Sequence, residues 1–444
     1  MDLAVNCIES RRKLKGKVQE WYDNPELIFP LKLSAEQCSS SATGRYKAAL
    51  ARAVYEQCRE DSSEAGMMRI ADLTGGFGVD TWHFSRLAEE VLYCEMQSIL
   101  CDAARHNFKA LGAENIRIEN ITIASESQPH HPEHSHCHPE HQTCHPERSE
   151  GSPSLLLSDF RPDIIYLDPA RRSETGKKVF LIEECTPDVL KIKDDLFACC
   201  RHILLKLSPM ADISMVCTRL GEHCREVHVV ATGGECKELL IWMDREWAGE
   251  YTITATEICH PEHQTCHPEH QTCHPERSEG SPYTSLRFTP SEEKASVPAT
   301  ATKEDITRAT HLFEPGKALM KSGAFNITAA RLGLSKLGRS THYYLMDKIS
   351  EETRHLGKTY KILSCRPLDK RSIKEAGKEF PHSEVTARNI PMDTDAFRKK
   401  LGVTSGDDAH IFGLKSDTSG NLIFICRISS DVPDEEGQAL LSQD

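Results

Sequence analysis

The spacing of apolar residues changes near residue 66. Before it, apolar positions recur with a helical period at 2–21 and 42–60, around an extended, proline-punctuated stretch at 24–34, so 1–65 is expected to be an N-terminal helical region. After it, short apolar runs alternate with helical patterns. Strands are expected at 69–73, 91–94, 115–123, 163–167, 202–207 and 226–231, and helices at 80–90, 97–111, 187–200 and 211–223.

A further apolar run, at 237–243, follows its predecessor after a tight Gly233-Gly234 turn. Because that link is too short for a parallel crossover, this strand must be antiparallel to the one before it. Five or six strand–helix units closed by one antiparallel strand predict an α/β fold with a Rossmann-like, doubly wound sheet. A closing hairpin of this kind is typical of class I methyltransferases.

The last third of the chain carries shorter elements. Residues 285–302 are rich in Thr, Ser and Pro and are expected to be a linker. Helices are then expected at 317–332, 372–380 and 394–401, and strands at 341–346, 358–365, 383–389, 410–415 and 421–428. The last two strands should form a hairpin around Ser419-Gly420-Asn421. These elements predict small α+β domains after the large sheet.

The expected domain boundaries follow from these changes of pattern. The helical region at 1–65 precedes the sheet domain at 66–258. A repeat insert at 259–282 is followed by a linker and a first small domain at 283–380, a second small domain at 381–432 and a tail at 433–444.

A seven-residue unit, Cys-His-Pro-Glu-His-Gln-Thr, recurs within 128–153 and 259–282. These two segments hold twelve of the 22 histidines and five of the 18 cysteines, a composition that can bind metal. A proline in every unit opposes regular structure, however, and no large apolar side chain is present to build a scaffold that holds ligands apart. We therefore interpret both segments as low-complexity inserts and expect no metal site in the fold.

Composition narrows the class of protein further. A length of 444 residues favours two or three domains, and a net charge of −13 argues against a surface that is basic everywhere. No apolar stretch reaches the roughly 18 residues of a membrane helix, and the N-terminus has no apolar signal region. A cytoplasmic protein with reduced, buried thiols is expected.

The segment 70–80 reads Ile-Ala-Asp-Leu-Thr-Gly-Gly-Phe-Gly-Val-Asp and joins an expected strand to an expected helix. Its glycines let the backbone approach a ligand and present helix N–H groups to it. A dinucleotide fingerprint would need Gly-x-Gly-x-x-Gly or Ala, but the sixth position counted from Gly76 is Thr81. The spacing therefore argues against a nicotinamide or flavin dinucleotide.

Acidic residues at two neighbouring strand ends indicate which ligand. Asp72 could engage the cationic amino-acid end of S-adenosylmethionine, and Glu95 could accept hydrogen bonds from both ribose hydroxyls. The adenine contact is expected near 120–126. The expected cofactor is S-adenosyl-L-methionine, and its expected binding residues are Asp72, Thr74, Gly75, Gly76, Gly78, Asp80 and Glu95.

The fourth expected strand ends in Tyr-Leu-Asp-Pro-Ala-Arg-Arg at 166–172, where an open α/β sheet carries its chemistry. This turn resembles the Asp/Asn-Pro-Pro-aromatic turn of amino-group methyltransferases, in which the acidic or amide side chain and the next carbonyl orient the target amine. Ala170 and Arg171 depart from that pattern, and an arginine plane could stack on a base or pair with a phosphate instead. Catalytic roles are expected for Asp168, Pro169 and Arg171. A cysteine nucleophile at Cys185, as carbon-5 pyrimidine methylation requires, is a lesser alternative to a buried or loop thiol.

Together these segments resemble a bacterial family, typical of Bacteroidetes, of class I methyltransferases with ferredoxin-like and THUMP-like C-terminal domains. The resemblance rests on six stretches of sequence: 71–85, 163–172, 183–190, 311–325, 386–392 and 397–403. It implies an RNA substrate, because THUMP domains deliver RNA to modification enzymes.

The charge pattern points the same way. From 354 to 400 there are twelve Lys and Arg against six Asp and Glu, a basic segment in an acidic protein that could hold phosphates or be a solvated helix face. The expected substrate-binding residues are Arg172, Lys370, Arg371 and Lys374. The sequence thus predicts a methyltransferase acting on an amine or ring nitrogen of RNA (rRNA or tRNA), with no membrane partner. A protein or small-molecule methyltransferase, and a non-catalytic RNA-binding factor that retains the fold, are the alternatives.

Overall fold

A computed structural model describes residues 2–58, 67–123, 153–171, 182–258 and 283–429. Both expected inserts lie outside these ranges, apart from Pro153, as does the tail at 433–444. The chain forms two compact units, one of Met1–Val230 with Lys237–Ile253 and one of Ala231–Cys236 with Thr254–Asp444. No helix within the described ranges has the length and apolar character needed to cross a membrane.

The N-terminal region of the first unit is helical, as expected, but in four pieces: α1 (Asp2–Leu14), α2 (Gln19–Asp23), α3 (Lys32–Gln37) and α4 (Ser41–Gln57). The expected helix at 2–21 is interrupted at Gly16, which has a φ of +71°. The stretch expected to be extended contains the start of α3. The Arg11 guanidinium donates hydrogen bonds to the carbonyls of Tyr22, Asn24 and Leu27, and these bonds fix the path between α2 and α3.

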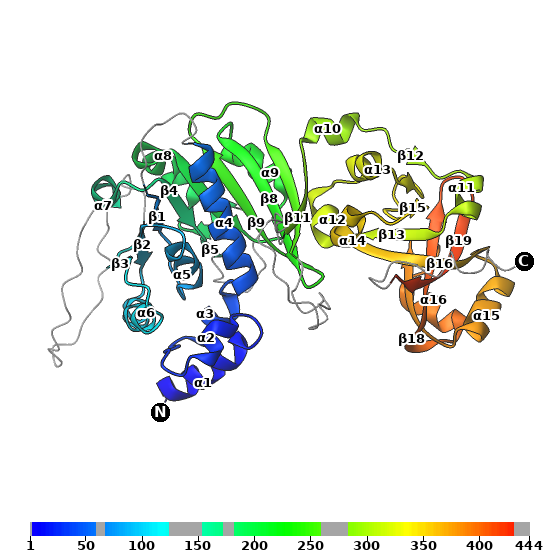
Figure 1. The fold of residues 1–444 in the computed structure, drawn as a ribbon, viewed down its shortest axis with the longest axis horizontal. Coiled ribbons are helices and arrows are strands. Elements are labelled where there is room, and N and C mark those ends of the chain that lie inside the picture. The colour runs from blue at the N-terminus through cyan, green and yellow to red at the C-terminus, as the bar shows by residue number, and fades with distance from the viewer. Residues whose placement is uncertain (1, 59–66, 124–152, 172–181, 259–282, 430–444) are drawn as a thin grey trace, which may run out of the picture. The chain divides into compact units, whose positions relative to one another are not determined.

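A mostly parallel sheet forms the centre of the first unit (Figure 1). Its strands β1 (Arg69–Asp72), β2 (Glu90–Glu95), β3 (Ile116–Asn120), β4 (Ile164–Leu167), β7 (His202–Leu207), β8 (Cys224–Thr232) and β9 (Glu235–Asp244) run in the order β8-β9-β7-β4-β1-β2-β3. The pairs β1–β2, β1–β4, β2–β3 and β4–β7 are parallel, whereas β9 is antiparallel to β7. The antiparallel closing strand predicted from the tight turn is confirmed, and it lies between β7 and β8.

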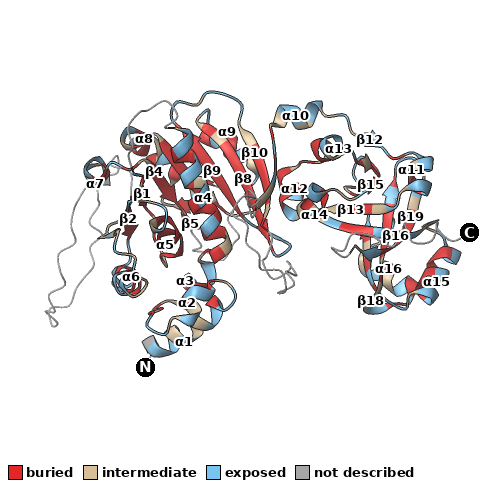
Figure 2. Ribbon diagram, viewed as in Figure 1, coloured by how far each residue is buried: buried red, intermediate tan, exposed pale blue. Residues whose placement is uncertain are grey.

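Helices α5 (Val79–Ser85), α6 (Ser98–Ala110), α7 (Pro153–Phe160), α8 (Val189–Cys199) and α9 (Ile213–Leu220) complete this unit. A short 3₁₀ turn (Ile182–Glu184) precedes a small ladder of β5 (Ala170–Arg171) with β6 (Cys185–Thr186). The central strands, such as β4, are buried along their length (Figure 2), which explains why they appear in the sequence as continuous apolar runs. The edge strand β3 is only partly buried. Helix α4 packs Ala48, Ala51 and Val54 against apolar side chains of the sheet.

Two expectations for the following residues were wrong. The stretch 285–302 is not a linker, because it holds most of β11 (Tyr283–Phe288), α10 (Pro290–Ala295) and β12 (Ala299–Thr300). Thr289 and Glu292 form a reciprocal capping box at the start of α10, so the polar residues there begin a helix. The helix expected at 317–332 is two helices, α12 (Lys317–Ser322) and α13 (Asn326–Leu332), because Gly323 ends the first with a φ of +77°.

The second unit contains an eight-stranded sheet in the order β12-β14-β15-β13-β16-β19-β18-β17. Its other strands are β13 (His311–Pro315), β14 (Ser335–Lys336), β15 (Tyr344–Met346), β16 (Gly357–Pro367), β17 (His382–Arg388), β18 (Thr404–Ser416) and β19 (Gly420–Ile428). Helices α11 (Lys303–Arg308), α14 (Glu351–Leu356), α15 (Lys370–Glu379) and α16 (Thr394–Leu401) accompany them. Strands β10 (Thr252–Ile258) and β11 belong instead to the sheet that contains β8 and β9, which has nine strands in all. The predicted β18–β19 hairpin is confirmed, with Gly420 in the left-handed region at its turn.

Candidate cofactor and catalytic site

The glycine turn between β1 and α5 is tightly built. Gly76 and Gly78 have φ values of +53° and +87°, which favour glycine. A Cβ added to Gly75 would lie 2.1 Å from the Tyr93 ring, and the Tyr93 hydroxyl donates a 2.7 Å hydrogen bond to the Gly76 carbonyl. At Gly75 the backbone therefore lies closer to the Tyr93 ring than a residue with a Cβ would allow.

Asp72 ends β1 and is 1% exposed. It accepts hydrogen bonds from the Thr81 hydroxyl, at 2.6 Å, and from the Thr74 backbone N–H, at 3.1 Å. No cationic side chain pairs with it in the described part of the chain. Burial raises the pKa of Asp72 to about 7, against the opposing effect of these two hydrogen bonds. A positively charged ligand would supply the counter-charge that this carboxyl lacks.

Glu95 ends β2 and is 8% exposed. One of its carboxylate oxygens accepts a 3.0 Å hydrogen bond from the Gly76 N–H, and the other accepts a 2.8 Å bond from the Gln97 N–H. Glu95 is thereby fixed in orientation, while each oxygen keeps further lone-pair capacity. The two acidic strand ends predicted to share a ligand thus lie on either side of one glycine turn.

Asp168 follows β4 and is linked to the same turn. Its backbone N–H donates a 2.6 Å hydrogen bond to the Thr74 hydroxyl, so Thr74 contacts both Asp72 and the turn that carries Asp168. The Asp168 carboxylate forms an ion pair with Lys206, near the end of β7. Burial alone would lower the pKa of Lys206, but the charges of Asp168, Glu238 and Asp80 together raise it, so Lys206 stays protonated.

Asp80 lies in a buried charge cluster below the turn. Lys47, which is 1% exposed, lies 3.0 Å from Asp80 and donates hydrogen bonds to both carboxylate oxygens of Glu238, at 3.0 and 3.1 Å. The Tyr166 hydroxyl donates a further 2.9 Å bond to Asp80. Burial alone would raise the pKa of Asp80, but the charges of Lys47 and Lys206 hold that pKa below its usual value. The cluster gives Asp80 a structural role that the sequence did not indicate.

A cavity of about 1190 Å³ joins these groups at the carboxyl ends of the strands. Nine of the predicted cofactor-binding and catalytic residues line it: Asp72, Thr74, Gly75, Gly76, Gly78, Asp80, Glu95, Asp168 and Pro169. Ile121, Thr122 and Ile123 also line it, within the segment where the adenine contact was expected. One wall comes from residues 31–39, around α3, which the sequence had not connected with the site. Asn107 holds this N-terminal region to α6 through two 2.8 Å hydrogen bonds with Ile28.

The remaining predicted residues are placed as follows. Arg172 lies outside the described residues, and Arg171 is described only as a backbone position in β5. Cys185 is buried, lines the cavity and pairs with Arg171 in the β5–β6 ladder. Lys370, Arg371 and Lys374 lie on the exposed side of α15 in the second unit, where Arg371 forms a 2.8 Å ion pair with Glu375.

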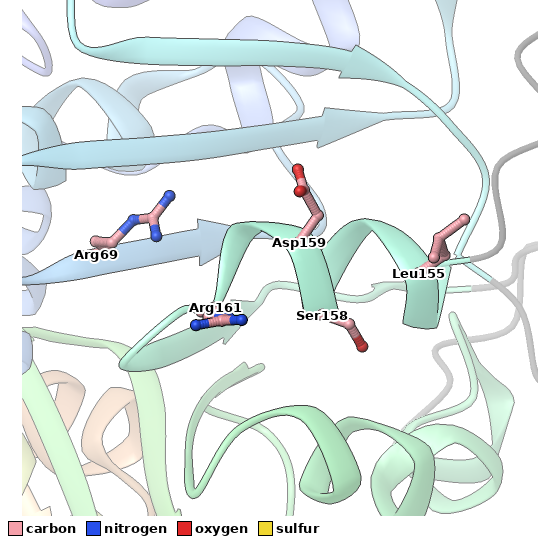
Figure 3. A pocket seen from close by; sticks show the side chains of 5 residues that line it. All are labelled: Arg69, Leu155, Ser158, Asp159 and Arg161. Atoms are coloured by element: carbon pink, nitrogen blue, oxygen red, sulfur yellow. The ribbon is translucent and has the colours of Figure 1, made fainter.

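A second hollow, of about 480 Å³, is lined by Arg69, Leu155, Ser158, Asp159 and Arg161 (Figure 3). Arg69 begins β1 and Arg161 precedes β4, so this hollow lies at the amino ends of the strands. Arg69 is already paired with Glu90 at 2.8 Å. Chemistry in such sheets occurs at the opposite, carboxyl edge, so this hollow is no candidate for the active site.

Two features together define the class of fold: a doubly wound sheet whose last strand inserts antiparallel beside its neighbour, and a glycine-lined cavity at the carboxyl edge. This is the class I methyltransferase fold, with an N-terminal helical segment and small α+β domains after it. The C-terminal part matches two family models, one for a ferredoxin-like domain at 311–352 and one for a THUMP-like domain at 357–427. The second match begins N-terminal to the boundary expected at 381, and the other expected boundaries stay predictions.

Solved structures support the same assignment. The chain is similar to the crystal structure of a putative methyltransferase from Porphyromonas gingivalis W83, with 26% sequence identity and a TM-score of 0.72, over 97% of this chain and 90% of that one. An rRNA methylase from Streptococcus thermophilus (11% identity, 44% and 93% coverage, TM-score 0.27) and the human methyltransferase 10 domain containing protein (12%, 55% and 96%, 0.31) also match, at TM-scores too low to carry an argument. No curated protein matches the sequence. The predicted resemblance to the Bacteroidetes-type family is thus confirmed by the two domain models and by the Porphyromonas structure.

Proposed function

We propose that this chain is an S-adenosylmethionine-dependent methyltransferase that acts on a nitrogen of an RNA nucleoside. The observation that carries the proposal is that Asp72, Glu95 and Asp168 line one cavity around a glycine turn, in which Gly75 has no room for a Cβ. When bound, the cofactor would supply an electrophilic methyl group on a cationic sulfur. Asp72 would hold its amino-acid end, Glu95 its ribose, and the Asp168 turn would orient the accepting nitrogen.

Two observations favour RNA as the substrate. The THUMP-like match covers α15, whose exposed side carries Lys370, Arg371 and Lys374. The described residues form no ion pair with Lys370 or Lys374, so both ammonium groups are available to phosphates. Methylation of a protein or small molecule, and RNA binding without catalysis, remain the competing functions.

Radioactive S-adenosylmethionine tests the proposal directly. We would incubate the purified full chain with total RNA or total protein from cells that lack its gene, and measure the counts in each fraction. The proposal predicts counts in RNA, and nucleoside mass spectrometry would then identify the product. Counts in protein alone would overturn the RNA assignment, and binding of RNA without any transfer would favour the non-catalytic alternative.

The pH dependence of cofactor binding should report on Asp72. Its raised pKa, about 7, means that roughly half of the Asp72 carboxyls carry a proton at pH 7 before the ligand binds. A cationic ligand stabilises the ionised form, so binding should release a proton, and affinity should fall by up to about tenfold per pH unit as the pH decreases below 7. Calorimetry in buffers of different ionisation enthalpy measures the proton count. In Asp72→Asn the release should disappear; an unchanged count would show that another group titrates.

The basic residues of α15 should contribute to RNA affinity and not to cofactor affinity. In a Lys370→Ala/Lys374→Ala double variant, we expect weaker RNA binding and a salt slope reduced by about 1–2, because each phosphate contact contributes about 0.7–0.9 to that slope. Lys294→Ala, an exposed lysine on α10, is the matched control. Equal salt slopes in all three proteins would remove α15 from the RNA-binding surface.

A further inference from the structure

The proposed function does not use Lys206, although this residue lines the same cavity. It lies near the carboxyl end of β7, directly after the apolar residues Ile203, Leu204 and Leu205, and its side chain is 13% exposed. A lysine at this depth requires a compensating partner, and here the partner is the proposed catalytic carboxylate, Asp168. The pair is thus a built feature of the cavity rather than a surface contact.

The geometry of the pair presents two complementary groups to a substrate. The Asp168 N–H donates a 2.6 Å hydrogen bond to the Thr74 hydroxyl. This bond restrains the backbone at Asp168 and so limits the movement of its carboxylate. A lysine ammonium has three donor hydrogens, one of which Asp168 accepts. An acceptor, the Asp168 carboxylate, and a cationic donor, Lys206, therefore stand side by side at the carboxyl ends of β4 and β7.

We infer, on the basis of the proposed function, that Asp168 and Lys206 select a lactam: a ring N–H beside a carbonyl, as in guanine and uracil. The ring N–H donates to Asp168, and the neighbouring carbonyl oxygen accepts from Lys206. The ring nitrogen is the atom that is methylated.

Methylation of a lactam nitrogen beside this pair balances in electrons and protons. The nitrogen lone pair forms the new N–CH₃ bond while the S–CH₃ bond breaks and its electron pair stays on sulfur. The lactam proton passes to the Asp168 carboxylate and then to solvent. Negative charge that develops on the carbonyl oxygen as the N–H proton leaves is stabilised by the adjacent ammonium.

An exocyclic amine, as in adenine or cytosine, would fit the same hydrogen bonds but not the same charge. Its nitrogen becomes more positive as it attacks, and a fixed ammonium on the neighbouring ring nitrogen would oppose that change. The aromatic residue of the amino-group methyltransferase turn is also replaced, by Arg171. The positive charge of Lys206 therefore distinguishes a lactam from an exocyclic amine, which hydrogen-bond geometry alone does not.

Product identity is the first test. We would methylate RNA from cells lacking the gene with the purified full chain and S-adenosylmethionine, digest it to nucleosides and identify the product by mass spectrometry. Methyl on guanine N1 or uracil N3 is the expected result. Methyl on an exocyclic amine, a ribose hydroxyl or carbon would overturn the lactam inference but leave RNA methylation intact. No methyl in RNA would overturn both.

The pH profile of Lys206 variants is the second test, and it distinguishes a catalytic from a structural role. In Lys206→Met, turnover at pH 7 should fall about 100-fold and recover as the pH rises, because the lactam proton must then leave without help from the ammonium. Lys206→Arg should restore most of the neutral-pH turnover. Lys191→Met, an exposed lysine of α8, is the control. An equal loss at every pH would make Lys206 merely structural, and if the Met variant does not fold, the Arg variant and the product identity decide.

Discussion

Replacing Asp168 with alanine should lower kcat by about 10³-fold while leaving the affinity for S-adenosylmethionine within about twofold of the wild type. The reason is that Asp168 lies on the β4 turn, where it orients the acceptor, whereas the predicted cofactor contacts come from Asp72 and Glu95. Single-turnover methylation and calorimetric titration of the cofactor measure the two quantities separately.

Asp168→Asn is the matched variant for this experiment. An amide can still accept a hydrogen bond but cannot take up a proton, so its kcat should fall between those of the wild type and Asp168→Ala. If Asp168→Ala turns over within tenfold of the wild type, Asp168 has no part in the mechanism. A loss of cofactor affinity as large as the loss of kcat would instead show that the carboxylate belongs to the cofactor pocket.

The second large effect concerns stability. Lys47→Met should reduce the free energy of unfolding of the first unit by about 3–5 kcal/mol, because it leaves Asp80 and Glu238 buried without their nearest cation. All four tryptophans of the chain, Trp21, Trp82, Trp242 and Trp247, lie in the first unit. Their fluorescence during a urea titration therefore reports on this unit.

Arg52→Met provides the control on the same helix. Arg52 pairs with Glu56 across one turn of α4, but both side chains are about half exposed, so this variant should lose only about 0.3–0.5 kcal/mol. Equal shifts of the unfolding midpoint in the two variants would show that the buried cluster adds nothing to stability beyond a surface pair. The contrast isolates burial as the cause, because helix and residue type are closely matched.

Much of the sheet was predictable because its central strands are buried along their length. The run at 202–207 was predicted with the bounds that β7 has, and Gly233-Gly234 correctly implied the antiparallel β9. The turn from Asp72 to Gly78 was equally predictable, because the end of an apolar run and a cluster of glycines can both be recognised from local sequence. That these groups share one cavity with Asp168 follows from the parallel strand order, which brings carboxyl ends to one edge.

Long-range pairing of charges was not predictable. Lys47 appears in the sequence as one polar position of a helix and Lys206 as one interruption of a strand, and nothing local shows that Glu238 or Asp168 will face them. A lysine inside the apolar run of β7 was the available signal for Lys206. The wall from residues 31–39 was missed for the same reason, because it depends on contacts such as Asn107 with Ile28, 79 positions apart.

The measurement that tests the central claim most directly is a calorimetric titration of S-adenosylmethionine into the wild type, Glu95→Ala and Glu119→Ala. Glu119 lies on β3 and pairs with Arg117 at 2.8 Å, away from the cavity lining. The account predicts one cofactor bound per wild-type chain, affinity reduced at least about tenfold in Glu95→Ala, which loses the charged acceptor, and wild-type affinity in Glu119→Ala. A folded wild-type protein that binds no cofactor, or binds it equally well without Glu95, would contradict it.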